Sequence, residues 1–217
     1  MARAREKAPA GGDAPVWEQR FERALENAER FFLKEGKVHQ AALALAERLS
    51  KENVPYAIAG AMALGAHGYE RMTTDVDLLV TREGLTRFKA ANLGRGYVEK
   101  FPGSKGLRDT ENGVTIDVLL TGDFPGDGRP KPVAFPDPAD PVATVQGERF
   151  RIVALPKLIE LKLASGMTAP HRLKDLADVL ELIRASRLPA ELSDELDPFV
   201  RQKYLELWQA AQATEPE

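Results

Sequence analysis

Residues 71–80, RMTTDVDLLV, place two aspartates, Asp75 and Asp77, in a run that ends in uninterrupted apolar residues. Side chains alternate between the two faces of a β-strand, so the two acids are predicted to share one face while Val76 and Leu78 point into the core from the other. Two carboxylates this close cannot both stay ionised in a partly buried place without a neutralising cation. The stretch therefore predicts a strand that carries a site for a hard divalent ion, Mg²⁺ or Mn²⁺.

A third aspartate lies in a later apolar stretch of the same character. Residues 114–120, VTIDVLL, place Asp117 between isoleucine and valine, where bulk water is scarce. The three strand aspartates together could hold two metal ions. The alternative is structural, because an aspartate at a strand end often caps a turn or pairs with an arginine, and Arg71 is near in the sequence.

A glycine precedes the aspartate pair at the junction of two predicted elements. Gly60 ends the strand pattern of residues 56–60 and opens a short helix over 61–68. Backbone amides at a helix start bind phosphate, so this junction and the acids together fit a metal-bound nucleoside triphosphate. An ordinary strand-to-helix turn is the alternative.

The remaining pattern alternates between helical and strand spacing, which predicts a mixed α/β (α+β) fold. Helices are predicted over residues 16–36, 37–53, 83–93, 156–167, 171–186 and 189–212. Further strands are predicted over residues 96–101, 107–111 and 143–155, and residues 111–113, ENG, form a hairpin turn.

The chain is predicted to divide into a flexible tail, an α/β core and a helical subdomain. The tail covers residues 1–14, the core with its N-terminal helices covers 15–155, and the helical subdomain covers 156–217. Within the core, residues 122–141 are rich in proline and glycine and form an irregular loop long enough to border a site.

Composition excludes several classes of protein. The 217 residues include 30 Lys and Arg against 33 Asp and Glu, which gives no overall positive charge for non-specific binding to nucleic acid or membranes. The absence of cysteine excludes disulfides, thiolate zinc sites and cysteine catalysis. Apolar runs are too short to span a membrane, so we expect a soluble, cytoplasmic protein without a membrane partner.

Residues 58–80, IAGAMALGAHGYERMTTDVDLLV, resemble the signature of the nucleotidyltransferase superfamily that includes DNA polymerase beta. The resemblance extends to the small minimal and abortive-infection bacterial branch. The family signature is a glycine followed by glycine or serine, a spacer, Asp-x-Asp or Asp-x-Glu, and a third acid on a later strand. The chain departs from it at Ala61, which offers phosphate only its backbone N–H. The resemblance implies a mixed-sheet nucleotidyltransferase core with N-terminal helices and a C-terminal helical subdomain.

Residues 161–182 resemble a second motif, that of the abortive-infection branch, in which a lysine is followed by Arg-x-Lys-Asp-x-x-Asp. The matching positions are Lys162, Arg172, Lys174, Asp175 and Asp178. The resemblance implies that the three strand aspartates are catalytic and hold the metal. It implies that the nucleotide is bound by Gly60, Ala61, Arg71, Lys162, Arg172 and Lys174.

Two positions of these motifs have local alternatives. Lys174 and Asp178 have the i,i+4 spacing of an ordinary helix ion pair. His67, which precedes a glycine at the end of the predicted helix, could cap or pack there instead of taking part in chemistry.

The implied function is transfer of a nucleoside monophosphate from a nucleoside triphosphate to a hydroxyl of an RNA or protein acceptor, with release of pyrophosphate. An enzyme of this kind could be the toxin of a toxin–antitoxin pair, with an antitoxin as its partner. One alternative is modification of a small compound such as an antibiotic, for which residues 189–198, PAELSDELDP, could supply acids that hold a cationic drug. Another is a nucleotide-binding partner subunit without turnover, which Ala61 suggests.

Overall fold

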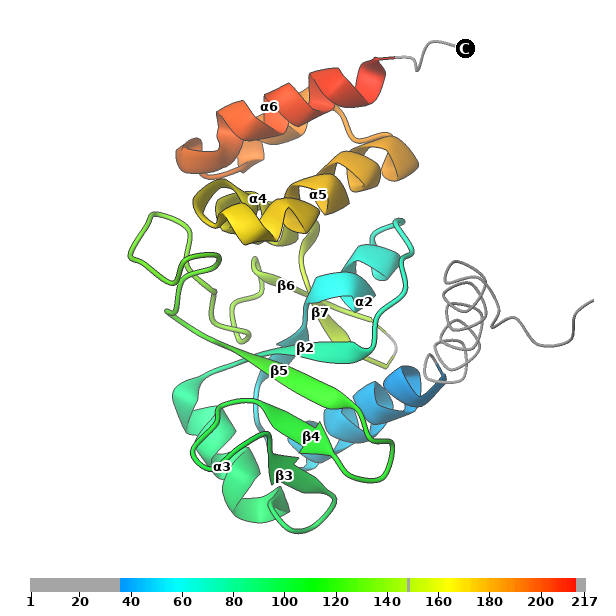
Figure 1. The fold of residues 1–217 in the computed structure, drawn as a ribbon, viewed down its shortest axis with the longest axis vertical. Helices are drawn as coiled ribbons and strands as arrows, with labels where there is room; N and C mark the ends of the chain where they lie inside the picture. The colour runs from blue at the N-terminus through cyan, green and yellow to red at the C-terminus, as the bar shows by residue number, and fades with distance from the viewer. Residues whose placement is uncertain (1–35, 148, 214–217) are drawn as a thin grey trace, which may run out of the picture.

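A mixed β-sheet runs through the described part of the chain, residues 36–147 and 149–213 of the computed structural model (Figure 1). Its strands are β1 (Tyr56–Ile58), β2 (Asp75–Val80), β3 (Tyr97–Glu99), β4 (Leu107–Asp109), β5 (Thr115–Leu120), β6 (Thr144–Gln146) and β7 (Arg151–Val153). They are ordered β3-β4-β5-β2-β1-β7-β6. The pairs β2/β5 and β1/β7 are parallel and the other neighbours antiparallel, so the predicted mixed α/β class is confirmed.

The helices fall close to the predicted positions, except that residues 189–212, predicted as one helix, form a 3₁₀ turn over 190–195 and a separate helix over 198–212. They are a helix over 36–51, α2 (Gly60–Ala66), α3 (Arg82–Asn92), α4 (Leu155–Thr168), α5 (Leu173–Ser186) and α6 (Pro198–Gln212), with 3₁₀ turns η1 (Pro170–Arg172) and η2 (Ala190–Glu195). Apart from Gly36, the helix predicted over residues 16–36 lies outside the described residues, as does the predicted tail. None of the helices in the described part is both long and apolar enough to cross a membrane.

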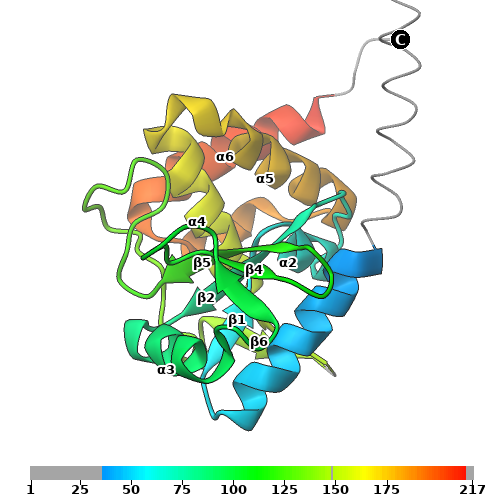
Figure 2. The same ribbon diagram turned by 60° about the horizontal axis from the view of Figure 1, so that its bottom comes forward.

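The sheet has a separate hydrophobic core on each face. The helix over 36–51 and α3 cover one face, while α2 and the stacked helices α4, α5 and α6 cover the other (Figures 1 and 2). The second core joins sheet residues to all three C-terminal helices, for example Leu79 of β2 to Leu163 of α4 and Tyr204 of α6. The division at residues 155 and 156 therefore falls inside a shared core and stays a prediction.

Strand β2 alternates as predicted. Val76 and Leu78 are buried in the core beneath the helix over 36–51. Asp75 and Asp77 lie on the opposite face, which α4 and α5 cover, and Leu79 of that face joins the second core. The strand thus presents two acids toward the helical layer because its other face is committed to apolar packing.

Candidate functional site

The three aspartates are brought together by the parallel pairing of β2 and β5. Asp77 lies directly opposite Asp117 in the register, and Asp75 lies opposite Thr115. Residues directly opposite on neighbouring strands point to the same face of a sheet. All three acids line one cavity, so the sequence prediction that they converge is consistent with the structure.

Asp77 is the electrostatic centre of this group. Burial, together with the negative charges of Asp75 and Asp117, raises the pKa of its carboxyl to about 6, although Lys162 and Arg172 act in the opposite direction. A carboxylate that is both desolvated and surrounded by like charge is unfavourable in the ionised state. A bound cation would remove both penalties.

The two outer acids have partners of their own. The Thr73 hydroxyl donates to Asp75 Oδ1, and Lys100 Nζ lies 3.0 Å from Asp117 Oδ1. Arg71, the partner considered from the sequence, contacts neither acid and binds Asp178 instead. The alternative in which Arg71 is the structural partner of the strand aspartates is therefore wrong.

The donor chemistry fits a hard divalent cation, because carboxylate oxygens are the ligands that Mg²⁺ prefers. Within residues 36–147 and 149–213, no three His, Cys, Asp or Glu side chains are already arranged as a set of metal ligands. The ion pair between Lys100 and Asp117 directs the third carboxylate toward a lysine. A metal ion held by all three acids would therefore compete with Lys100 for the charge of Asp117.

Gly60 fits closely against the central acid. It adopts φ +59° at the start of α2, and a Cβ atom at this position would lie 1.7 Å from Asp77 Oδ2. The glycine thus serves two purposes, since it permits the left-handed backbone and leaves room for the carboxylate. The neighbouring Ala61 is 5% exposed and does not line the cavity, so its methyl group does not enter the site.

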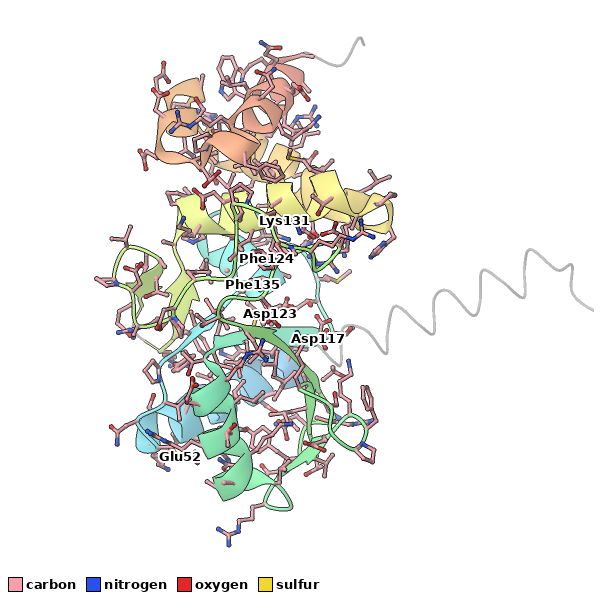
Figure 3. The ribbon with its side chains drawn as sticks, turned by 90° about the vertical axis from the view of Figure 1, so that its left-hand side faces the viewer. Glu52, Asp117, Asp123, Phe124, Lys131 and Phe135 are labelled. Carbon is pink, nitrogen blue, oxygen red and sulfur yellow. The ribbon has the colours of Figure 1, made fainter. Side chains whose placement is uncertain are left out.

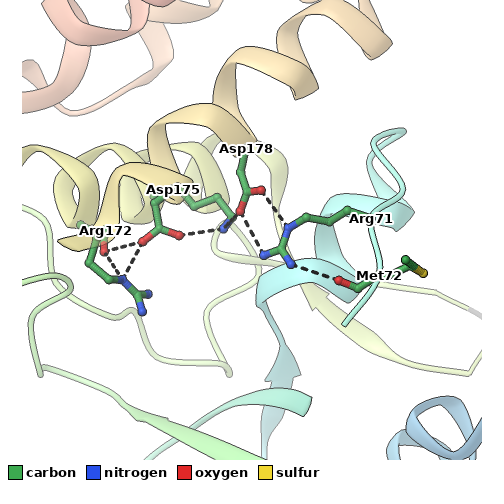
Figure 4. A network of polar contacts seen from close by, with 7 residues as sticks. Arg71, Met72, Arg172, Asp175 and Asp178 are labelled. Carbon is green, nitrogen blue, oxygen red and sulfur yellow. Dashed lines mark hydrogen bonds and ion pairs between the residues drawn. The ribbon is translucent and has the colours of Figure 1, made fainter. Parts of the chain in front are cut away.

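Positive side chains face the acids from the helical layer. Lys162 of α4 is buried at 7% exposure, and its Nζ lies 3.1 Å from Asp175 Oδ1 and 2.6 Å from Asp178 Oδ2 (Figure 4). Burial tends to raise the pKa of Asp175, but attraction by Lys162, a hydrogen bond from Ser165 and the charge of Arg172 lower it overall. Two α5 carboxylates therefore hold the Lys162 side chain in place.

Two arginines extend the same network. Arg71 donates from Nε to Asp178 Oδ1 at 2.8 Å and from Nη2 to Asp178 Oδ2 at 3.1 Å, a bidentate arrangement. Arg172 donates from Nε to Asp175 Oδ2 at 2.9 Å, while half of its side chain remains exposed. Arg172 thus keeps donors available for an anion in the cavity.

Lys174 does not form the helix ion pair that its spacing suggested. Among the residues that the structure describes, Asp178 pairs with Lys162 and Arg71, and Lys174 takes part in no salt bridge. Asp178 is 2% exposed and points inward, whereas Lys174 is exposed at the edge of the cavity. The i,i+4 interpretation is wrong because tertiary partners took the aspartate.

The acids and the cations line one cavity of about 460 Å³ between the sheet and helices α4 and α5. That volume is within the range of small-molecule sites. Its walls combine the strand acids and Gly60 with Arg71, Lys162, Arg172 and Lys174. Eight of the nine predicted site residues therefore meet at one place, and Ala61 is the exception.

The loop over residues 122–141 closes one side of the cavity, as predicted from its length. Pro125, Gly126 and Phe135 are among its lining residues. Figure 3 shows the loop rising from the end of β5 toward the helical layer, with Asp117 on the strand below it. A Cβ atom on Gly126 would lie 2.4 Å from Thr168 Oγ1, so the loop is packed tightly against α4.

A buried lysine organises this loop from within. Lys131 has a side chain that is 6% exposed, and its Nζ donates to the Pro125 carbonyl at 2.7 Å and to Asp127 Oδ1 at 2.6 Å. It also lies over the Phe124 ring, 5.8 Å from the centroid. These contacts hold the wall of the cavity in one conformation.

Two features considered from the sequence lie outside the cavity. His67 hydrogen-bonds the Val153 carbonyl through Nε2 at 2.8 Å, which supports its packing role. The acidic segment 189–198 contributes no residue to the cavity, because η2 packs beside α6 at the far side of the helical layer (Figure 1). The expectation that this segment supplies acids at the cleft is wrong.

Sequence reasoning missed Lys100, Phe135 and Ser165. Lys100 reaches Asp117 only through the shape of a turn, and Phe135 lies in a segment without regular spacing. Ser165, which donates to Asp175 at 2.7 Å, lies one helical turn after Lys162. Of the three missed residues, only Ser165 could have been found from its spacing in the sequence.

No protein-family model matches the chain, and no curated protein matches it in sequence. Among solved structures, the chain is similar to ANT(2″)-Ia in complex with adenylyl-2″-tobramycin, with a TM-score of 0.48, 16% identity, and coverage of 82% of this chain and 97% of that one. A solution structure of the antibiotic-resistance factor ANT(2″)-Ia has a TM-score of 0.49 and 16% identity, and the match covers 79% of this chain and 97% of that one. An antigenic nucleotidyltransferase-like protein from Paracoccidioides brasiliensis has a TM-score of 0.47 and 19% identity, and the match covers 83% of this chain and 94% of that one. With each of these TM-scores below 0.5, the likenesses carry no functional weight, and the case for a function rests on the cavity itself.

Proposed function

We propose that this protein is a divalent-metal-dependent nucleotidyltransferase that moves a nucleoside monophosphate from a nucleoside triphosphate to a hydroxyl acceptor. The observation that carries the proposal is the cavity whose sheet side bears Asp75, Asp77 and Asp117 and whose helix side bears Lys162 and Arg172. A triphosphate with bound Mg²⁺ has both signs of charge, and this cavity offers complementary charge to each.

The residues divide by role. Asp75, Asp77 and Asp117 would hold Mg²⁺ or Mn²⁺, which supplies stabilisation of the charge that develops on the attacking and leaving oxygens. Lys162, Arg172 and Lys174 would bind triphosphate oxygens from the opposite wall, and Arg71 supports them by fixing Asp178. Backbone amides at Gly60 and Ala61 would contribute donors at the start of α2.

In the reaction, the acceptor hydroxyl oxygen forms a bond to the α-phosphorus, and the bond from that phosphorus to the oxygen bridging to the β-phosphate breaks. The bridging oxygen leaves with pyrophosphate and keeps the electron pair. Asp117 accepts the hydroxyl proton and passes it to water. The cavity's contribution is to hold donor and acceptor in line and to place fixed charge around the transferring group.

The surface beside Asp117 favours an anionic acceptor over a cationic drug. Lys100 contacts Asp117, and Lys105 of the same turn lies 3.4 Å from Asp123, which also binds Arg82. These three cations have side chains between 40% and 64% exposed. Three cations face two carboxylates on this surface, and the acidic segment 189–198 lies elsewhere, so we propose a macromolecular acceptor, RNA before protein.

Transfer of label from α-phosphate-labelled nucleoside triphosphates tests the proposal. Each of the four nucleotides is incubated with Mg²⁺ or Mn²⁺ and with total RNA or lysate protein, and wild type is compared with Asp77→Asn. We expect label in the RNA pool that the variant abolishes. Label that persists in the variant, or an unlabelled acceptor in every combination, would contradict the proposal.

A further inference from the structure

Lys100 forms an ion pair with Asp117, the third strand acid. Its Nζ lies 3.0 Å from Asp117 Oδ1, and the two side chains are 40% and 43% exposed. Asp117 lines the cavity beside Asp77, its neighbour in the register. The lysine therefore supplies positive charge at the acidic side of the cavity, on the wall opposite Lys162 and Arg172.

The turn that carries Lys100 is fixed by several contacts. Lys89 of α3 lies 2.7 Å from Glu99 Oε1 and donates to the Ser104 carbonyl at 2.6 Å. The other oxygen of Glu99 accepts from the backbone N–H of Gly103 at 2.7 Å. Because both ends of the turn are held to α3, the base of the Lys100 side chain has a defined position.

A glycine makes the path of this side chain possible. The Lys100 N–H donates to the Gly106 carbonyl at 3.1 Å, and a Cβ atom on Gly106 would lie 2.7 Å from Lys100 Cδ. The lysine stem thus runs across the surface that Gly106 leaves open on its way to Asp117. A methyl group there would displace the stem but would meet other atoms only at 3.5 Å or more.

We propose that Lys100 is an internal counter-cation that competes with a divalent ion for Asp117 and so sets the metal affinity of the cavity. This inference rests on the proposed function, in which Asp117 is a metal ligand. In the metal-free protein the ammonium group neutralises the third acid. When the ion binds, the Asp117 carboxylate exchanges the ammonium for the metal, and Lys100 turns toward solvent.

The competition is expected to be modest. Exposed ion pairs contribute roughly 0.2–1 kcal/mol, which corresponds to about a 1.4- to 5-fold change in an equilibrium constant. A divalent ion therefore displaces Lys100 readily, but removal of the lysine should tighten metal binding by a factor of about 1.4 to 5.

The test is a Mn²⁺ titration of the full chain without nucleotide, in which free Mn²⁺ is followed by electron paramagnetic resonance. Lys100→Met removes the ammonium group, and Gly106→Ala displaces it while keeping its charge. Lys105→Met is the matched control, because it removes an equal charge from the same turn without touching Asp117. Lys100→Met is also measured in an Asp117→Asn background, and Asp77→Asn is titrated beside the wild type to show whether the ion binds at the three acids.

We expect tighter Mn²⁺ binding for Lys100→Met and for Gly106→Ala, unchanged binding for Lys105→Met, and no effect of Lys100→Met when Asp117 is already Asn. Equal tightening by Lys100→Met and Lys105→Met, or unchanged binding in Gly106→Ala, would overturn the inference and leave the proposed function standing. If Mn²⁺ binds no variant, or binds without dependence on Asp77, the proposed function and the inference fail together.

Discussion

Asp77 of β2 and Asp117 of β5 lie directly opposite each other across a parallel strand pair, on the face of the sheet that α4 and α5 cover. Strand register alone brings together two acids that are 40 residues apart in the chain. Burial and the charges of Asp75 and Asp117 raise the pKa of Asp77, while Lys162, which is buried in the facing helix, lowers it. The cavity thus places a carboxylate of raised pKa between a negative and a positive wall.

Asp77 should make the metal-free protein less stable as the pH rises. Its folded-state pKa of about 6 exceeds the ordinary 3.8, so the folded state retains a proton that the unfolded state releases between these values. The resulting loss of folding free energy begins near pH 4 and reaches its full size above pH 6. It is at most about 3 kcal/mol, at 1.36 kcal/mol per pKa unit. Asp77→Asn should therefore be more stable than wild type at pH 8 in thermal unfolding with EDTA, and similar to it at pH 4. Equal differences at both pH values would contradict the pKa shift.

Metal binding near pH 6 should release protons from the site. A cation favours the ionised form of Asp77, so its pKa falls when the ion binds. Calorimetric titration with Mg²⁺ in two buffers of different ionisation enthalpy should give different apparent heats at pH 6 and nearly equal heats at pH 8. Equal apparent heats in the two buffers at pH 6 would contradict a raised pKa of Asp77 in the metal-free protein.

Loss of Asp178 should destabilise the protein strongly. The side chain is 2% exposed and joins Lys162 to Arg71, so Asp178→Ala leaves two cations with reduced compensation in a buried place. Breaking a buried pair by removal of one partner costs about 3–5 kcal/mol. Chemical denaturation measures this change. Glu181→Gln on the same helix is the control, because its pair with Arg184 is exposed and should contribute less than about 1 kcal/mol.

Gly60→Ala should damage both stability and the site. A left-handed backbone costs about 1–2 kcal/mol for a residue with a Cβ atom, and here the methyl group would also collide with Asp77. We expect a lower midpoint of denaturation together with weaker Mn²⁺ binding. Gly65→Ala in the same helix is the control, since a Cβ atom there meets nothing within 4 Å and alanine is the better helix former. A Gly60→Ala protein with wild-type metal affinity would contradict the close fit of Gly60 to Asp77.

The sequence was sufficient for features that depend on local spacing. Alternation in residues 75–80 predicted which side chains of β2 face the core, because one face of a strand must be apolar when it is buried. The proline- and glycine-rich loop was predicted to border a site for the same kind of reason, since its composition prevents regular structure. Most of the candidate site followed from these local patterns and from the family resemblance.

Features that depend on distant partners were not predictable in this way. Asp178 binds Arg71, which is 107 residues away, and this contact removed the local pair expected with Lys174. Lys100 reaches Asp117 through a turn held by contacts to α3, and no spacing rule indicates such a reach. Local propensity describes which interactions are available, whereas tertiary packing decides which of them form.

The central claim is that the cavity transfers a nucleotidyl group, and a comparison of two labels tests it most directly. The same acceptor pool is incubated with Mg²⁺ and with a nucleoside triphosphate labelled at either the α- or the γ-phosphate. Transfer of the α label alone, lost in Asp77→Asn, is the predicted result, because the α-phosphorus is attacked and pyrophosphate leaves. Transfer of the γ label, or of neither label by a protein that binds Mn²⁺ and nucleotide, would contradict the account.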